Sequence, residues 1–425
     1  MNVEAMDESE ALVSAMTEIQ STAQQWPDRT RPIIRRVHYL LRSIEKGDQY
    51  FNPEVVAIGP YHRHDPQVQP AEAIKKAVAL DFCKSSRRSV REFYKVVRDV
   101  TPLARLCYAD RFDDISDKEF ADMMFFDGCF LLQFIVTATG YIPASLSVER
   151  WMSSFNLDRV FRDVMLLENQ LPWVVLEALM SFRWVPIDLF LQKIVAKIDM
   201  TAGLLPPYDE GGSHRDNDRS PCHLLELVRE KFLGPQVQRG DDIVTHISIF
   251  TSAIDLAEVG VRICASDTFR FRNFSFRRGP LYGWLSLPPI VLTTYNRIVL
   301  SNLVAFEMCP GVASESSVGS YLSLLVALIS REEDVKELRS KKILYGGLSD
   351  QQSLSFFKSL SPYLMTGNDY MSLLQHLNDY HRRRKVRVFI HKIVYNNFNF
   401  LLAATSVVLF LITILQTIFT IYPRK

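Results

Sequence analysis

The chain has 425 residues, of which 48% are hydrophobic and 23% charged, and its formal net charge is +1. These values indicate a folded protein with an ample core, and the even charge balance argues against a nucleic-acid-binding protein. The cysteines form no C-x-x-C pair, so we expect them to be reduced and mostly buried in a cytosolic protein. They are Cys83, Cys107, Cys129, Cys222, Cys264 and Cys309.

The first half of the chain is predicted to be mostly helical. Residues 1–31 form a polar, partly helical lead-in. Val55 to Ile58 has the pattern of a strand, which Gly59-Pro60 would end. Apolar side chains at helical spacing, and a proline able to start a helix, then predict a series of helices. These helices cover Ala71 to Tyr108, Asp117 to Thr137, a stretch from about Asp158 past Leu171, and Pro172 to Met180.

From residue 201 onward the sequence predicts further helices and one small sheet. Residues 201–221 are the clearest loop, and Gly311 to Ser320 is a second loop. Apolar and polar residues alternate at Val261-Arg-Ile, Phe269-Arg-Phe and Phe274-Ser-Phe, which predicts a minor antiparallel β element. Helices are expected over Cys222–Leu233, Ser252–Val259, Thr294–Cys309, Arg331–Lys342, from a capping box at Ser349-Asp-Gln-Gln352, and over Tyr370–Tyr395. No internal repeat is evident, so residues 32–380 are predicted to form a single, mainly α domain.

The C-terminal segment 398–422 is predicted to be a transmembrane anchor. Phe400 to Ile421 carries no charge. As a helix it would be about 33 Å long, enough to cross a hydrocarbon core of about 30 Å. Only the short tail 423–425 follows it. A basic juxtamembrane segment, 381–397, precedes it and contains Arg382, Arg383, Arg384, Lys385, Arg387 and Lys392.

The charges around this segment predict its orientation. More basic residues precede it than follow it, which places the N-terminal head in the cytoplasm. Met1 to Gln20 has neither a basic n-region nor an apolar h-region, so no signal peptide is expected. We therefore predict a single-pass, tail-anchored protein and favour the plasma membrane. The basic segment is either a topology signal alone or also a contact with anionic lipid.

Several segments, in this order, resemble a family of plant proteins called domain of unknown function 247. The resemblance implies a mostly helical plant protein with a C-terminal membrane anchor and no established enzyme activity. It also implies that a grass member could be a pollen-side determinant of self-incompatibility. The segments are Val55-Val-Ala-Ile-Gly-Pro-Tyr-His62, Met123-Met-Phe-Phe-Asp-Gly-Cys-Phe-Leu-Leu132, Leu166-Leu-Glu-Asn-Gln-Leu-Pro172, Ser252-Ala-Ile-Asp-Leu-Ala-Glu-Val-Gly-Val261, Asn302-Leu-Val-Ala-Phe-Glu307 and the C-terminal run.

Two carboxylates are the most informative candidates for chemistry. The sequence contains no G-x-S-x-G, P-loop, G-x-G-x-x-G or H-E-x-x-H motif, and His62-Arg-His64-Asp65 lacks the further ligands of a metal site. Asp127 and Glu168 each fall on the apolar stripe of a predicted helix, where an unpaired charge would be costly. One interpretation is acid/base catalysis. The other, which we favour, is a buried structural network with Arg35, Arg36, Asn169 or Gln170.

The sequence as a whole favours a non-enzymatic, membrane-tethered protein that acts in protein–protein recognition or signalling. Its expected partners are the lipid bilayer and a protein whose identity the sequence does not specify, and no cofactor or metal is predicted. The alternatives are a membrane-anchored enzyme that uses Asp127 and Glu168, or a structural scaffold. The sequence does not specify an oligomeric state.

Overall fold

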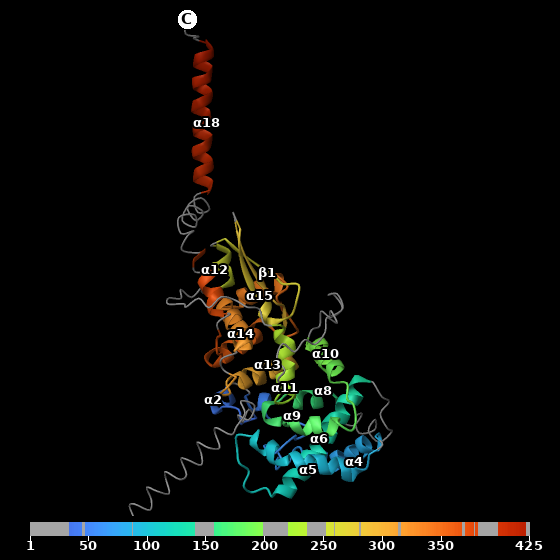
Figure 1. Cartoon of the computed structure of the whole chain (residues 1–425). Coiled ribbons are helices and arrows are strands. Elements are labelled where there is room, and N and C mark those ends of the chain that lie inside the picture. Colours follow the sequence, from blue (N-terminus) through green and yellow to red (C-terminus); the bar gives the residue numbers. More distant parts are fainter. Residues whose placement is uncertain are drawn as a thin grey trace, which may run out of the picture.

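The protein is mainly helical, as predicted, and its described residues include two small sheets (Figure 1). Its head is elongated. The early helices lie at the end away from the C-terminal helix α18 (Phe398–Ile421), and the larger sheet and later helices lie at the end near it. The residues that the computed structural model describes are 34–44, 47–86, 88–140, 157–198, 220–235, 252–258, 260–279, 282–312, 316–367, 370–377, 379–380 and 398–421.

Helix α6 (Asp117–Thr139) is the central helix of the early half. A capping box between Ser116 and Glu119 starts it, and Gly140, with a φ of 67°, ends it. It is long and apolar enough to cross a membrane by length and composition, but 78% of its most apolar window is buried inside the head. Helix α4 (Pro70–Lys84) packs along it, so α6 is a core helix.

The predicted helical stretch from Ala71 to Tyr108 forms two helices. α4 ends at Lys84, and Ser89 starts α5 (Val90–Leu106) with a second capping box. α5 packs against α6 and α9 (Trp173–Met180), and α9 begins directly after Pro172, as predicted. The other early helices are α2 (Tyr39–Arg42), α3 (Gly47–Phe51), α8 (Leu157–Asp163) and α10 (Ile187–Ile198).

The helix expected from Asp158 is shorter than predicted. α8 ends at Asp163, and Leu167–Asn169 form a separate 3-10 turn, η1. The side-chain amide of Asn169 donates to the carbonyl of Asp163, and that of Gln170 donates to the carbonyls of Val164 and Leu166. These amides occupy carbonyls that a continuing helix would use. Glu168 therefore lies on a turn and not on an α-helical stripe.

The larger sheet is mixed, so the prediction of an antiparallel element is only partly right. Strand β3 (Gly283–Leu287) lies between β1 (Val261–Ala265) and β2 (Ser275–Arg278), parallel to the first and antiparallel to the second. Strand β3 was not predicted from the sequence. The strand expected around Phe269 is wrong, because Phe271–Asn273 form the 3-10 turn η2.

The later helices match their predicted positions closely. One exception is the predicted loop Gly311 to Ser320, inside which α14 begins. A capping box between Ser349 and Gln352 starts α16, as predicted. β4 (Ile290–Val291) pairs in parallel with β5 (Leu344–Tyr345). The later helices are α11 (Leu224–Leu233), α12 (Ala253–Glu258), α13 (Thr294–Glu307), α14 (Ser317–Leu328), α15 (Glu332–Ser340), α16 (Asp350–Leu360) and the 3-10 turn η4 (Ser361–Tyr363).

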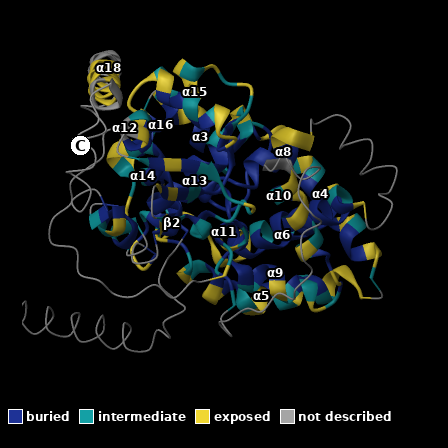
Figure 2. Cartoon of the chain, turned by 90° about the horizontal axis from the view of Figure 1, so that it is seen from above, coloured by how far each residue is buried: buried dark blue, intermediate teal, exposed yellow. Residues whose placement is uncertain are grey.

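The predicted membrane segments are described only in part. In α18 the side chains are described over Thr405–Thr417, where they are apolar for the most part and exposed (Figure 2). This stretch is shorter than the about 20 residues that a span needs, so the span stays a prediction. Residues 370–377 and 379–380 are helical. The basic segment 381–397, the lead-in 1–31, the tail 423–425 and most of the loop 201–221 lie outside the described residues.

Candidate functional site

The segment Glu54 to Gly59 is neither helix nor strand and belongs to neither sheet. Its backbone N–H groups bond to buried side chains. Both carboxylate oxygens of Asp163 accept from the nitrogen of Glu54, and Oδ2 also accepts from those of Val55 and Val56, at 2.7 to 3.1 Å. The prediction of a strand at Val55–Ile58 is therefore wrong, since a carboxylate at the end of α8 binds the backbone that a neighbouring strand would have paired with.

The rest of the segment is held in the same manner. Asn169 accepts from the nitrogen of Ile58 at 2.6 Å and donates to the carbonyl of Val56 at 3.0 Å. Asp127 accepts from the nitrogen of Gly59 at 2.8 Å. Gly59 has a φ of +75°, and a Cβ there would lie 2.8 Å from the hydroxyl of Tyr108. Only glycine fits this position without strain.

Asp127 forms a buried ion pair with Lys75 of α4. The Nζ of Lys75 lies 2.6 Å from Oδ1 of Asp127, and it also contacts Glu72 at 2.6 Å. Burial lowers the pKa of Lys75, but Asp127 and Glu72 outweigh that effect, so the pKa lies above its ordinary value. Burial raises the pKa of Asp127, and Lys75 opposes this rise. The net shift of the pKa is therefore upward for both partners, by burial for Asp127 and by the neighbouring carboxylates for Lys75.

Glu168 is bound from three sides. Its Oε1 accepts from the nitrogen of Val37 at 2.6 Å. Its Oε2 lies 2.8 Å from NH2 of Arg42, in an ion pair, and 3.2 Å from Nε2 of His62, and neither contact has the alignment of a hydrogen bond. Burial raises the pKa of Glu168, but His62, Arg42 and the Val37 N–H together bring it below its ordinary value. The carboxylate is therefore held in its charged form.

Side chains in the same network join the early and late halves of the head. The side-chain oxygen of Gln170 accepts from the nitrogen of Leu225 on α11 at 3.0 Å. The hydroxyl of Tyr108 donates to the backbone carbonyl of Gln170. Asn302 of α13 accepts from the nitrogen of Leu167 at 2.9 Å and donates to the carbonyl of Tyr50 at 2.8 Å. The four polar residues singled out from the sequence, Asp127, Glu168, Asn169 and Gln170, are all buried here.

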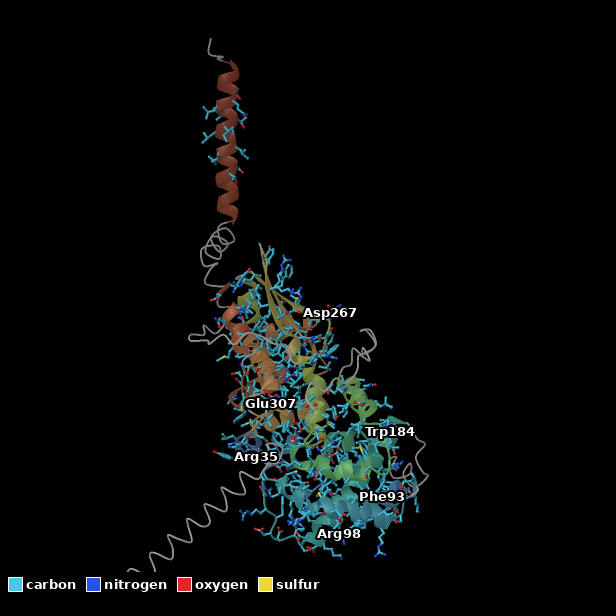
Figure 3. The ribbon with its side chains drawn as sticks, in the orientation of Figure 1. Arg35, Phe93, Arg98, Trp184, Asp267 and Glu307 are labelled. Carbon is cyan, nitrogen blue, oxygen red and sulfur yellow. The ribbon has the colours of Figure 1, made fainter. Side chains whose placement is uncertain are left out.

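Another buried carboxylate, Glu307, belongs to the late half of the head and is labelled in Figure 3. Its Oε1 lies 2.7 Å from Nε and from NH2 of Arg229. The same carboxylate accepts from the nitrogens of Val318 and Gly319 at 3.0 and 2.7 Å. It therefore caps the first turn of α14, where the helix dipole favours a negative charge.

The geometry seals the two candidate carboxylates. Asp127 and Glu168 are each 1% exposed, and protein groups contact all four of their oxygens. A small hollow elsewhere is lined by apolar side chains, including Phe232, Phe271 and Leu300, and includes neither carboxylate. Within the described ranges, no group of three or more His, Cys, Asp or Glu side chains is placed to hold a metal ion. These side chains fix the backbone path, and neither carboxylate faces a space for a substrate.

Sequence reasoning missed several members of this network. The arginine on Glu168 is Arg42, while the predicted Arg36 pairs with Asp110 at 3.0 Å. Lys75 could have been found, because its position on α4 is in phase with Ala71 and Val78 on the buried face. For Glu307, a charge inside an otherwise apolar run was the available signal, whereas Asp163 and Arg229 lie beside other charged residues and carry no such signal.

All six cysteines are free, and three of them, Cys83, Cys129 and Cys309, are buried. The other three are partly exposed, so the prediction that most of the cysteines are buried holds for three of the six.

Comparisons with known proteins identify the family. A family described as plant protein of unknown function, DUF247, matches residues 34–412. The UPF0481 protein At3g47200 from Arabidopsis thaliana is 26% identical over 346 residues, which cover 73% of this chain and 69% of that protein. The putative UPF0481 protein At3g02645 from the same plant is 21% identical over 469 residues, 86% of each chain. No solved structure matches the chain. The family match covers most of the chain and includes every segment of the buried network. The chain therefore belongs to the DUF247 family of plant proteins.

Proposed function

We propose that this protein is a non-enzymatic, membrane-tethered recognition protein whose helical head binds another protein at the cytoplasmic face. The observation that carries the proposal is the exposure of α18. Leu409 is 63% exposed and Phe410 is 66% exposed, and the other apolar side chains between Val407 and Ile412 are exposed as well. Such a surface is unfavourable in water, and a bilayer core would cover it.

The anchor would hold the head at a surface without giving it a transport role. A single helix cannot line a pore unless it oligomerises, and its backbone groups are satisfied within the helix itself. The basic segment 381–397 would lie on the cytoplasmic side by the positive-inside rule. We favour the plasma membrane as the location of the protein.

The sealed carboxylates support a recognition role over catalysis. Acid/base catalysis requires a carboxylate within reach of a substrate proton. Asp127 and Glu168 instead bond to Lys75, Gly59, Arg42, His62 and Val37. A rigid interior of this kind would support a binding surface, and pollen-side self-incompatibility would be one form of such recognition in a grass.

The anchor is tested with the full-length chain tagged at both termini and expressed in plant cells. We expect it to resist alkaline extraction from membranes, and its N-terminal tag to be digested by protease added to the cytosolic side of intact vesicles. The double variant Val408→Arg/Ile412→Arg places charges in the run and should release the protein. The matched control Val408→Leu/Ile412→Leu should remain bound. Release of the wild type, or protection of its head, would overturn the proposal.

The recognition role needs a separate test. Proximity labelling from the membrane-bound full-length chain should mark one predominant protein whose labelling is lost when the head surface is varied. A scaffold would instead mark several unrelated proteins to a similar degree. Hydrolytic or transfer activity that Asp127→Asn abolishes in a folded variant would favour the enzyme.

A further inference from the structure

The outer face of the three-stranded sheet carries a row of basic and aromatic side chains. In the strand register Trp284 of β3 is the partner of both Arg262 on β1 and Arg277 on β2. All three are exposed, whereas Ile263 and Leu285, the next residues along their strands, are buried. The side-chain alternation of strands therefore places Arg262, Trp284 and Arg277 side by side on one face. We call these three residues the Arg-Trp-Arg row.

Aromatic rings hold one end of the row. The guanidinium carbon of Arg262 lies 3.9 Å from the ring centre of Tyr282 and 5.3 Å from that of Trp284. Tyr282 is 40% exposed and Trp284 is 41% exposed. The cation–π contacts orient the guanidinium while leaving much of both rings accessible. The row therefore combines fixed positive charge with amphipathic aromatic surface.

The chain leaves the head beside this sheet on its way to α18. The ring of Tyr380 packs on Phe276 of β2 at 5.2 Å, and its hydroxyl donates to the carbonyl of Gly260 at 3.3 Å. Arg278 pairs with Asp379 at 3.8 Å. Tyr380 is the last described residue before α18. In Figure 1 the strands of this sheet project at the end of the head from which α18 departs.

The neighbouring charges leave the row positive. Asp379 is paired with Arg278, which is the residue after Arg277 on β2 and is therefore not part of the row. Asp267 follows the far end of β1, and Figure 3 shows it lower on the head. In the same view the exposed Arg98 lies at the opposite end of the head, and the exposed Trp184 lies lower on the head than Asp267 and Glu307.

We propose that the Arg-Trp-Arg row binds the phosphate headgroups of anionic phospholipids in the bilayer that α18 enters, which rests on the membrane anchoring proposed above. Guanidinium groups match phosphate oxygens with paired hydrogen bonds. Tryptophan and tyrosine prefer the headgroup level of a bilayer, where one edge of the ring is apolar and the other polar. The contact adds a second attachment to the anchor and fixes which face of the head points to the cytoplasm.

The test places the full-length protein in vesicles of phosphatidylcholine, alone or mixed with phosphatidylserine. Lipids that carry a spin label near the headgroup quench the fluorescence of a tryptophan that lies at that depth. With phosphatidylserine present we expect quenching that Trp284→Phe removes and that Trp184→Phe leaves unchanged. The double variant Arg262→Gln/Arg277→Gln should reduce the quenching to the level found in phosphatidylcholine alone, as should high salt. The matched charge control Arg98→Gln should have no effect.

Two failures can be told apart in this design. Wild type that does not float with either kind of vesicle would refute the anchor itself. Wild type that floats with both but shows no quenching dependent on Trp284 would overturn the lipid contact and leave the anchor standing. Quenching that is equal with and without phosphatidylserine would also overturn it, because the arginines would then have no part in the contact.

Discussion

Lys75 and Asp127, on different helices, form an ion pair of 2.6 Å, and each side chain is at most 3% exposed. The second oxygen of Asp127 holds the backbone nitrogen of Gly59. One carboxylate therefore joins α4, α6 and the segment from Glu54 to Gly59. A buried pair of this kind costs desolvation when it forms, so its value shows mainly when one partner is removed.

The first prediction concerns Asp127→Ala. It leaves the Lys75 ammonium buried without its main counter-charge and frees the nitrogen of Gly59. We expect a loss of about 3 to 5 kcal/mol in the free energy of unfolding, with a melting temperature lowered by several degrees. Urea unfolding of the full-length chain in detergent, followed by circular dichroism, measures it.

The companion variant separates charge from packing. Lys75→Met/Asp127→Leu removes both charges and should be less destabilising than Asp127→Ala alone, because no charge stays buried. An Asp127→Ala variant as stable as the wild type would contradict the structural role and reopen catalysis by this carboxylate.

The second prediction concerns Gly59→Ala. With a φ of +75°, an alanine is strained by about 1 to 3 kcal/mol, and its Cβ would also meet Tyr108 Oη at 2.8 Å and Gln170 O at 3.1 Å. We expect the total loss in unfolding free energy to exceed the strain alone. Gly347 provides the matched control, since it is exposed and its added Cβ meets nothing within 4 Å. Gly347→Ala should be neutral or slightly stabilising. Equal effects of the two variants would refute the argument.

The third prediction is a pH dependence that arises from His223. Its Nδ1 accepts from the nitrogen of Glu226 at the start of α11, and burial lowers its pKa from 6.5 to about 3. Below pH 6.5 the unfolded chain takes up a proton that the folded chain does not. The free energy of unfolding should therefore fall, by about 1.4 kcal/mol per pH unit, as the pH drops from 6.5 towards 3.

The variant His223→Asn isolates this slope. Asparagine can also cap a helix but does not titrate, so the variant should be less stable at pH 7 and lack this slope. Burial raises the pKa of Asp127 and Asp163, whose contributions change in the opposite direction with pH. The difference between wild type and variant at each pH removes these contributions. A difference that stays constant between pH 7 and pH 5 would contradict the prediction.

Local signals in the sequence were sufficient for most of the helices. Pro172 and the capping box from Ser349 to Gln352 act on residues within one turn, and the structure confirms the helices that they start. The apolar phase of α6 also placed Asp127 on a buried face. A short-range pattern can therefore show that a polar residue is buried.

Contacts between residues far apart in the sequence could not be predicted from these local signals. Val55 to Ile58 has an extended pattern, but nothing in it specifies that Asp163, 108 residues beyond Val55, takes the place of a strand. Likewise β3 has a weak alternation of its own and is stabilised by partners on both sides. The partner of a buried charge, or of a central strand, is set by the fold as a whole.

The fourth prediction compares the two members of the Arg229–Glu307 pair. Glu307 is the last residue of α13, and its carboxylate lies at the first turn of α14. There it accepts hydrogen bonds from the nitrogens of Val318 and Gly319 as well as from Arg229. Arg229→Met leaves the carboxylate its two backbone donors and the positive end of the helix dipole. Glu307→Ala instead takes the carboxylate from a buried guanidinium and uncaps α14. We therefore expect Glu307→Ala to cost about 3 to 5 kcal/mol of unfolding free energy, and Arg229→Met clearly less.

Urea unfolding of both single variants and of Glu307→Ala/Arg229→Met completes a double-mutant cycle. The double variant should be more stable than Glu307→Ala alone, because the guanidinium is no longer buried without this carboxylate. Glu337→Ala is the control, since its contact with Lys341 is at the surface and 3.4 Å long, and it should change the stability by at most about 1 kcal/mol. If Arg229→Met proved as costly as Glu307→Ala, the cap on α14 would contribute nothing, and the carboxylate would serve the arginine alone.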